Sequence, residues 1–168
     1  MILICHGYDK AHSCSIGDYT KFIIMKIIMT AFVCLLVFSC TNKQPEIYSN
    51  SSAAINGYDP VAYFTNQEPV KGNQQFAYQW KDANWLFSSQ ENLELFSKDP
   101  EKYAPQYGGY CAYGCSKGKK ATTDPNAWTI VDGKLYLNHS PEVKELWMKQ
   151  QKEKIEMADN EWPQIKDK

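Results

Sequence analysis

Residues 75–100 read QFAYQWKDANWLFSSQENLELFSKDP, and this stretch decides the fold. Apolar and polar residues alternate over Gln75–Trp80, and a second short apolar run covers Trp85–Phe87. Lys81–Asn84 lies between the two runs as turn material. Two short runs of β-type residues joined by a polar turn predict a β-hairpin.

A helix is expected directly after this hairpin. Ser88 stands three residues before Glu91, which is the spacing of a capping box. Leu93 and Phe96 supply apolar side chains for the buried face of the helix. The helix should end at Asp99-Pro100, because the residue before a proline is disfavoured in the helical conformation.

A second hairpin and a last helix are predicted further along the chain. Thr129–Val131 and Leu135–Leu137 flank Asp132-Gly133, a dipeptide favoured in tight hairpin turns. Ser140-Pro141 is typical of a helix start, and apolar residues then recur at helical spacing up to Trp162-Pro163, where the helix should end. The sequence therefore predicts an α+β fold, a small antiparallel sheet of two hairpins with helices that include a long C-terminal one.

The composition leaves room for one domain. With 168 residues, 43% of them hydrophobic and 14% aromatic, the chain can build one core but hardly two. We expect this domain at residues 53–165. Within it, Tyr103–Gly118 is rich in glycine and aromatic residues, which predicts a closely packed irregular segment.

The chain begins with the pattern of a secretory signal. A largely apolar run precedes Cys40. With translation starting at Met25, residues 25–39 are the signal segment and Lys26 is its positive end. Residues 1–24 are then a misassigned upstream start.

The end of this run is similar to the bacterial lipobox, in which a small residue, here Ser39, precedes a cysteine that receives a lipid. The resemblance implies lipidation of Cys40 and an envelope protein anchored to the membrane, facing the periplasm or the cell exterior. An ordinary signal is one alternative; an uncleaved anchor is another, and its span of roughly 20 residues would have to include Lys26. Residues 40–52 have no apolar period and are expected to form a flexible tether.

The charge of the chain argues against nucleic-acid binding. The formal net charge is -1, and all 18 basic residues are lysines. Phosphate binding needs a clustered basic surface, and base readout relies on the guanidinium fork of arginine. We therefore expect no nucleic-acid partner, and the sequence identifies no protein partner.

The order of several short motifs resembles the YHS domain family. Asp59-Pro60-Val61 stands where the family has its DPV start, and Phe87, Phe96, Asp99-Pro100 and Tyr103 stand at its later signature positions. The stretches GYDPVAYF, YGGYCAYG and DGKLYLN and the final Trp-Pro pair match a longer version of the domain. The family occurs beside copper-transporting ATPases, so the resemblance implies metal handling through cysteine.

This chain departs from that pattern at the thiols. The positions that carry cysteine in the metal-associated members are Ala62, Ser88 and Asn92 here. Any metal role therefore depends on other residues. Asp59 precedes a proline, which is typical of a turn residue.

Two cysteines remain downstream of Cys40, namely Cys111 and Cys115. Their C-x3-C spacing is compatible with a soft-metal site, a disulfide, or two unrelated small residues. Copper(I) can be held by two or three soft ligands, and His139 is the one histidine available to join them. His139 equally suits an exposed loop, and Cys111 equally suits a small buried residue. The candidate metal ligands are thus Cys111, Cys115 and His139, with copper as the candidate cofactor.

A pocket is expected next to Cys111. Its candidate lining residues are Tyr58, Tyr63, Tyr107, Gly108 and Gly109. The two glycines permit a close backbone approach, which suits a ligand pocket as well as a tight turn, and we favour the turn.

No catalytic activity is expected. The chain has neither a G-x-S-x-G nor an H-E-x-x-H motif, and a nucleophilic Cys111 would have only His139 as an imidazole base. The sequence predicts a non-enzymatic envelope lipoprotein that binds copper or another soft metal ion. A thiol-redox protein using Cys111 and Cys115, or a partner-binding module without a cofactor, are the alternatives.

Overall fold

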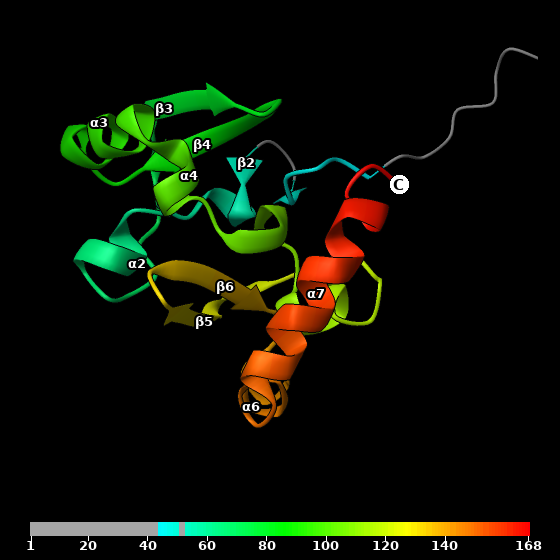
Figure 1. The fold of residues 1–168 in the computed structure, drawn as a ribbon. Helices are drawn as coiled ribbons and strands as arrows, with labels where there is room; N and C mark the ends of the chain where they lie inside the picture. The colour runs from blue at the N-terminus through cyan, green and yellow to red at the C-terminus, as the bar shows by residue number, and fades with distance from the viewer. Residues whose placement is uncertain (1–43, 51–52) are drawn as a thin grey trace, which may run out of the picture. The chain divides into compact units, whose positions relative to one another are not determined.

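The computed structural model describes residues 44–50 and 53–168, and these residues form an α+β fold (Figure 1). The lipidation candidate Cys40 and the signal segment at residues 25–39 lie outside the described residues. Three two-stranded antiparallel sheets are present in the described part of the chain. The two expected hairpins are therefore confirmed, each as a separate sheet, and a third small sheet accompanies them.

The first hairpin pairs β3 (Asn73–Trp80) with β4 (Ala83–Phe87). Its turn consists of Lys81 and Asp82 alone, with φ of 49° and 57°. A two-residue turn with positive φ at both positions matches the right-handed twist of the flanking strands. The sequence-based turn was two residues too long, because Ala83 pairs with Trp80 and belongs to β4.

The helix after this hairpin is α3 (Gln90–Lys98). Its N-cap is Ser89, whose hydroxyl accepts a hydrogen bond from the Asn92 N–H, and not Ser88 as the capping-box spacing predicted. Ser88 instead hydrogen-bonds to Asp59. The predicted end is confirmed, because Asp99 closes α3 and also caps the following short helix α4 (Pro100–Tyr103).

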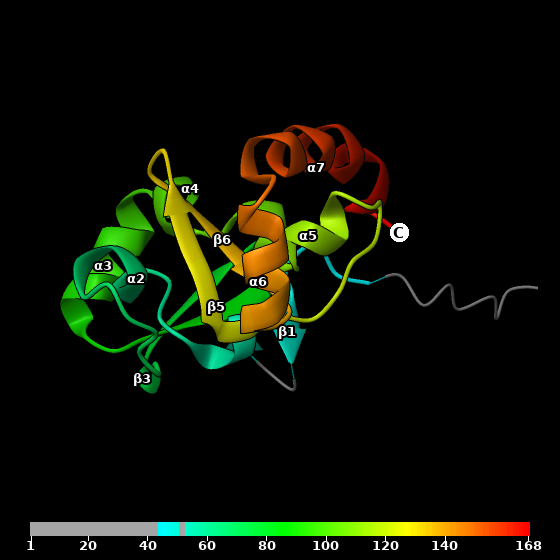
Figure 2. The same ribbon diagram turned by 90° about the horizontal axis from the view of Figure 1, so that it is seen from below.

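The second hairpin pairs β5 (Asp124–Val131) with β6 (Lys134–Asn138) around the predicted Asp132-Gly133 turn. The side chains of β6 alternate between two cores. Leu135 and Leu137 face the first core, and Tyr136 faces the second. β6 therefore contributes side chains to both hydrophobic clusters. Figure 2 shows this strand beside its partner β5.

The expected C-terminal helix is interrupted. α6 (Pro141–Met148) begins at the predicted cap, where the Ser140 hydroxyl accepts from the Val143 N–H. α7 (Gln151–Ile165) follows after Gln150, which leaves the helical conformation with φ of -133°. α7 also continues through Pro163, which the sequence analysis placed beyond its end.

The segment expected to be irregular begins at the last residue of α4 and contains two short helices. They are the 3-10 helix η2 (Gln106–Gly109) and the single turn α5 (Ala112–Cys115). Another single turn, α2 (Ala62–Thr65), follows the DPV motif, after the short 3-10 helix η1 (Ile55–Gly57). None of the helices among residues 44–50 and 53–168 has the length and apolar character that a membrane crossing requires.

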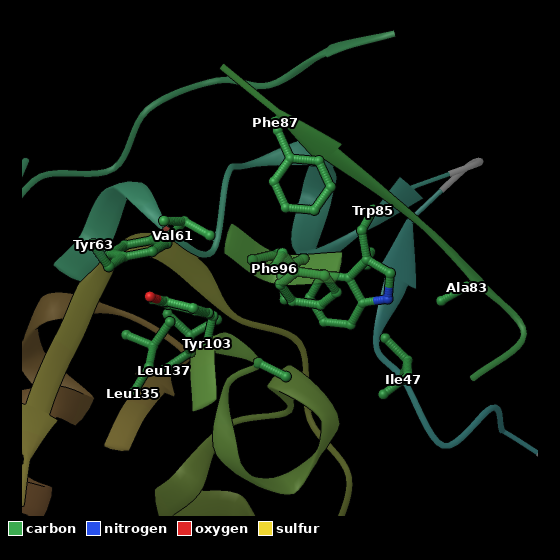
Figure 3. Close-up of a cluster of buried hydrophobic side chains, with 13 residues drawn as sticks. Ile47, Val61, Tyr63, Ala83, Trp85, Phe87, Phe96, Tyr103, Leu135 and Leu137 are labelled. Atoms are coloured by element: carbon green, nitrogen blue, oxygen red, sulfur yellow. The ribbon is translucent and has the colours of Figure 1, made fainter. Parts of the chain in front are cut away.

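The first core is built around aromatic rings of the first hairpin and α3 (Figure 3). Phe96 is fully buried, and its ring centroid lies 5.1 Å from that of Trp85 and 5.1 Å from that of Phe87. Aromatic pairs at such distances contribute beyond their buried area. These three rings fix α3 against β4.

Packed structure begins upstream of Ala53. β1 (Ser49–Asn50) pairs with β2 (Ala53–Ala54), and the side chains of Ile47 and Tyr48 are buried in the first and second core respectively. The sequence analysis assigned these residues to a tether because their apolar side chains follow no period. Two isolated apolar residues suffice here to dock the segment.

Candidate functional site

Asp59 is a fully buried carboxylate that accepts five hydrogen bonds. Its Oδ1 accepts from the N–H groups of Val61 and Ala62, at 2.8 and 3.3 Å. Its Oδ2 accepts from the N–H and hydroxyl of Ser88, at 2.8 and 2.7 Å, and from Asn92 Nδ2 at 2.7 Å. The turn role predicted for Asp59 is therefore confirmed. Asp59 also connects this turn to α3 through its hydrogen bonds with Ser88 and Asn92.

The positions that the family resemblance assigns to thiols meet around this carboxylate. Ala62, Ser88 and Asn92 all donate to Asp59, and none of them offers a soft ligand atom. A thiolate metal site at this place therefore does not fit the residues of this chain.

The Cys111 sulfur lies in a buried polar setting before α5. The Gly114 N–H donates to Sγ at 3.4 Å, and Sγ lies 3.7 Å from Asn138 Oδ1, which also accepts from the Tyr113 N–H. Burial raises the pKa of the Cys111 thiol, and the backbone N–H groups of Gly114, His139 and Tyr113 oppose that rise. The resting thiol is protonated, with donors in place that favour a thiolate.

Asn138 is fully buried and leaves one donor unused. Its Oδ1 accepts two hydrogen bonds, whereas its Nδ2 has no hydrogen-bond partner in the described part of the chain. A buried donor without a partner costs about 1 to 3 kcal/mol. The amide beside Cys111 therefore has capacity for an additional acceptor.

Cys115 is fully buried in the second core and, like Cys111, is a free thiol. Burial, followed by the nearby Cys111, raises the pKa of Cys115 to about 12. His139 is exposed, and its Nδ1 lies 3.1 Å from both the carbonyl and the hydroxyl oxygen of Thr122. The structure thus places the two thiols one helical turn apart in the chain and leaves the His139 ring at the surface.

The described residues contain no cluster of three or more His, Cys, Asp or Glu side chains that could hold a metal ion. A tetrahedral zinc site, which needs four ligands, does not fit them. The two thiols offer at most a two-coordinate site.

The five residues of the expected pocket do not line one cavity. Tyr63 is buried in the first core and donates to the Pro125 carbonyl, and Tyr58 lies under the Lys71 ammonium, 4.5 Å from its ring centroid. Gly109 packs against Ile55. Tyr107 and Gly108 line the cavity described below.

The surroundings of Gly108 distinguish between the two roles considered for it, a tight turn and a ligand pocket. It has a φ of 61°, its carbonyl accepts from the Tyr48 N–H at 2.8 Å, and a Cβ here would collide with the Glu46 carbonyl oxygen. The glycine therefore serves a tight conformation and also lets residues 46–48 pass close to η2.

A cavity of about 190 Å³ lies between residues 46–47, the first hairpin turn, α4, η2 and α7. Its lining includes three carboxylates, one ammonium and three aromatic rings: Glu46, Glu101, Asp159, Lys81, Trp80, Tyr107 and Trp162. Tyr107 has a φ of 56°, uncommon for a bulky residue, and its hydroxyl donates to Asp159 Oδ1 at 2.9 Å. Burial, and then this hydrogen bond, raise the pKa of Tyr107, so its hydroxyl stays protonated.

Lys81 bridges two walls of the cavity. Its Nζ lies 3.4 Å from Glu46 Oε1, 3.1 Å from Glu101 Oε1 and 4.5 Å from the Trp80 ring centroid. Partial burial lowers the Lys81 pKa, but Glu101 and Glu46 outweigh that effect and raise it overall. Lys81 is therefore a cation held by carboxylates over an aromatic face.

The sequence analysis missed the charged residues of this cavity. Glu46 lay in the expected tether and Lys81 in a turn, and no role was assigned to Asp159. The one available signal was the concentration of tryptophans and tyrosines, which does not specify which rings meet.

Comparison with known proteins identifies one family. The YHS domain model matches residues 61–107, which run from the DPV motif into η2. Cys111, Cys115 and His139 lie beyond the matched residues, whereas Trp80, Lys81 and Glu101 lie within them. No curated protein and no solved structure matches the chain.

Proposed function

From the YHS match and the two thiols that follow it, we propose that the chain is a non-enzymatic, lipid-anchored envelope protein that binds copper(I). Its ligands are Cys111 and Cys115. The anchor places the domain outside the cytoplasm, in the periplasm or at the cell exterior, with the membrane as its partner.

The observation that carries this proposal is a pair of free thiols at the single turn α5, where Cys111 is the N-cap and Cys115 is the last residue. Thiolates select soft metal ions, and copper(I) is satisfied by two of them. Metals that need three or four protein ligands are less compatible with the described residues, because His139 faces Thr122 at the surface. Cys111 is the first ligand, since backbone N–H groups already favour its thiolate.

Binding must displace protons, because only the thiolate is a ligand. Burial raises the pKa of both thiols, so copper(I) affinity should increase with pH. The buried setting also protects the bound ion from water.

The test is copper(I) titration of the purified protein, its Cys111→Ser variant and its Cys115→Ser variant, with the metal-to-protein ratio measured after removal of excess ion. Wild type should hold one ion, and Cys111→Ser should hold none while its circular dichroism spectrum is unchanged. Cys115→Ser should weaken binding. Wild type that retains no copper(I) would refute the metal site.

A thiol-redox function predicts a different result for the same proteins. Under mild oxidation the wild type would lose both free thiols to a disulfide, and either substitution would leave one thiol reactive. Free-thiol counting before and after oxidation separates this outcome from copper binding. If both thiols stay unchanged and no metal binds, the remaining alternative is a partner-binding module without a cofactor.

The lipid anchor is supported by the apolar run that ends at Ser39-Cys40. Lipidation with more than one chain holds a protein stably at a membrane. Cys40→Ala should therefore move the protein from the membrane to the soluble fraction or leave it unprocessed, as judged by fractionation and mass. A membrane-bound variant of unchanged mass would contradict the anchor.

A further inference from the structure

We propose that the cavity lined by Trp80, Tyr107 and Trp162 binds the quaternary or methylated ammonium group of a small organic cation, and that Lys81 is its resident, displaceable cation. This site is separate from the thiols and does not depend on the copper proposal.

The charges of the lining favour a cation. The lining contains the carboxylates of Glu46, Glu101 and Asp159 and the single ammonium of Lys81, which leaves two formal negative charges in excess. The Asp159 carboxylate is oriented by the Tyr107 hydroxyl at 2.9 Å. An arriving cation therefore meets an oriented carboxylate that Lys81 does not neutralise.

The aromatic rings determine which kind of cation fits. Aromatic faces attract cations within about 6 Å of the ring centroid, and quaternary ammonium groups are bound in this way. The Lys81 ammonium lies 4.5 Å from the Trp80 centroid between two carboxylates, so the cavity already stabilises an ammonium of its own chain. A ligand cation would occupy the same environment once Lys81 swings outward.

Size and hydrogen bonding favour a methylated ammonium. A cavity of about 150 Å³ is known to hold benzene, so about 190 Å³ is sufficient for a molecule of choline size. A primary ammonium must satisfy three N–H donors, whereas a quaternary ammonium has none. Aromatic faces can therefore surround a quaternary ammonium without leaving a donor unpaired.

Lys81 can move because it is only partly buried. About 37% of its side chain is exposed, and exposed ion pairs contribute little stability. Replacing Lys81 with glutamine removes the competing cation and leaves the three carboxylates and the Trp80 face intact. Lys81→Gln should therefore bind the ligand more tightly.

The experiment is calorimetric titration of the full chain with choline at low salt, repeated with its neutral isostere 3,3-dimethyl-1-butanol. We expect saturable choline binding, weak or absent binding of the neutral alcohol, and weaker choline binding as salt rises. Lys81→Gln should tighten choline binding about fivefold, and Glu101→Gln should weaken it about fivefold, each corresponding to one ion pair of roughly 1 kcal/mol.

Lys71→Gln is the matched control, because the Lys71 ammonium also lies over a ring, that of Tyr58, but outside this cavity. It should leave choline affinity unchanged, as should Cys111→Ser. Thermal unfolding of each variant verifies that it is folded. Absence of choline binding by both wild type and Lys81→Gln, or equal binding of the neutral alcohol, would overturn the proposal.

Discussion

At the scale of single residues, Asp59 shows how this chain stabilises a buried carboxylate through hydrogen bonds. Its five donors come from its own turn and from residues 29 and 33 positions further along the chain. Buried carboxylates are tolerated when their lone pairs are satisfied in this way. Asp59 therefore holds the DPV turn, the end of β4 and the start of α3 together.

Asp59→Asn should destabilise the domain by about 3 kcal/mol, because the new amide group faces donors that then lack an acceptor. Ser88→Ala removes one hydroxyl donor and should cost about 1 kcal/mol. Urea unfolding followed by tryptophan fluorescence measures both values. An Asp59→Asn variant as stable as wild type would show that the network contributes nothing.

The raised thiol pKa values make the free energy of unfolding decrease as the pH becomes alkaline. Cys115 has a pKa of about 12 in the folded protein, against about 8.5 for an unperturbed cysteine. The unfolded chain therefore loses this proton first as pH rises, and stability decreases. The contribution of the Cys115 thiol is complete below about pH 8.5 and is lost as pH rises toward about 12.

Cys115→Ala removes this contribution, so its free energy of unfolding should decrease less steeply than that of wild type between about pH 9 and pH 11. Titrating groups that do not interact with Cys115 are common to both proteins and cancel in the comparison. Equal slopes would mean that the thiol titrates normally in the fold.

At the scale of secondary-structure elements, the two hairpin turns can be compared directly. Both have positive φ at their two central residues, with Lys81-Asp82 in one and Asp132-Gly133 in the other. Only the second uses glycine, the residue for which such angles carry no steric cost. The first turn is therefore strained at Asp82, which has a φ of 57°.

Asp82→Gly should stabilise the domain by about 0.5 to 1 kcal/mol, because glycine adopts the left-handed conformation without the steric strain of a side chain. Gly133→Ala should destabilise it by about 1 kcal/mol, and purely through the backbone, since a Cβ at Gly133 meets nothing within 4 Å. Thermal unfolding shows whether each substitution stabilises or destabilises the domain. Effects of the same sign would show that contacts outside the turns dominate.

Local signals in the sequence predicted most elements. The Asp132-Gly133 dipeptide and the Ser140-Pro141 cap act within a few residues and were read correctly. Ser88 was misread because two serines stand side by side, and the choice of Ser89 as cap depends on the Asp59 carboxylate 29 residues away. The cavity was missed for the same reason, since its carboxylates come from three distant segments and share no local pattern.

At the scale of the whole described domain, two cores share the β6 strand, and Lys120 joins the beginning of the domain to its end. The Lys120 Nζ donates to the carbonyls of Gln44 and Pro45 at 2.9 and 3.1 Å, and to that of Lys166 at 2.6 Å. It also lies 5.3 Å from the Tyr110 ring centroid. One ammonium thus fixes residues 44–45 against the end of α7.

Lys120→Met keeps a long apolar side chain over Tyr110 but removes the donors, so it should loosen this junction without unfolding the cores. Hydrogen exchange of the Gln44 amide, which donates to the Lys168 carbonyl at 3.0 Å, should become about tenfold faster, since a loss of roughly 1.4 kcal/mol in local opening free energy has that effect. The Tyr48 amide, which donates to Gly108, should change less because its side chain is buried in the second core. Lys119→Met, an exposed neighbour, is the matched control and should leave both amides unchanged. If Gln44 exchanges equally fast in all three proteins, the burial of Ile47 and Tyr48 alone holds the junction.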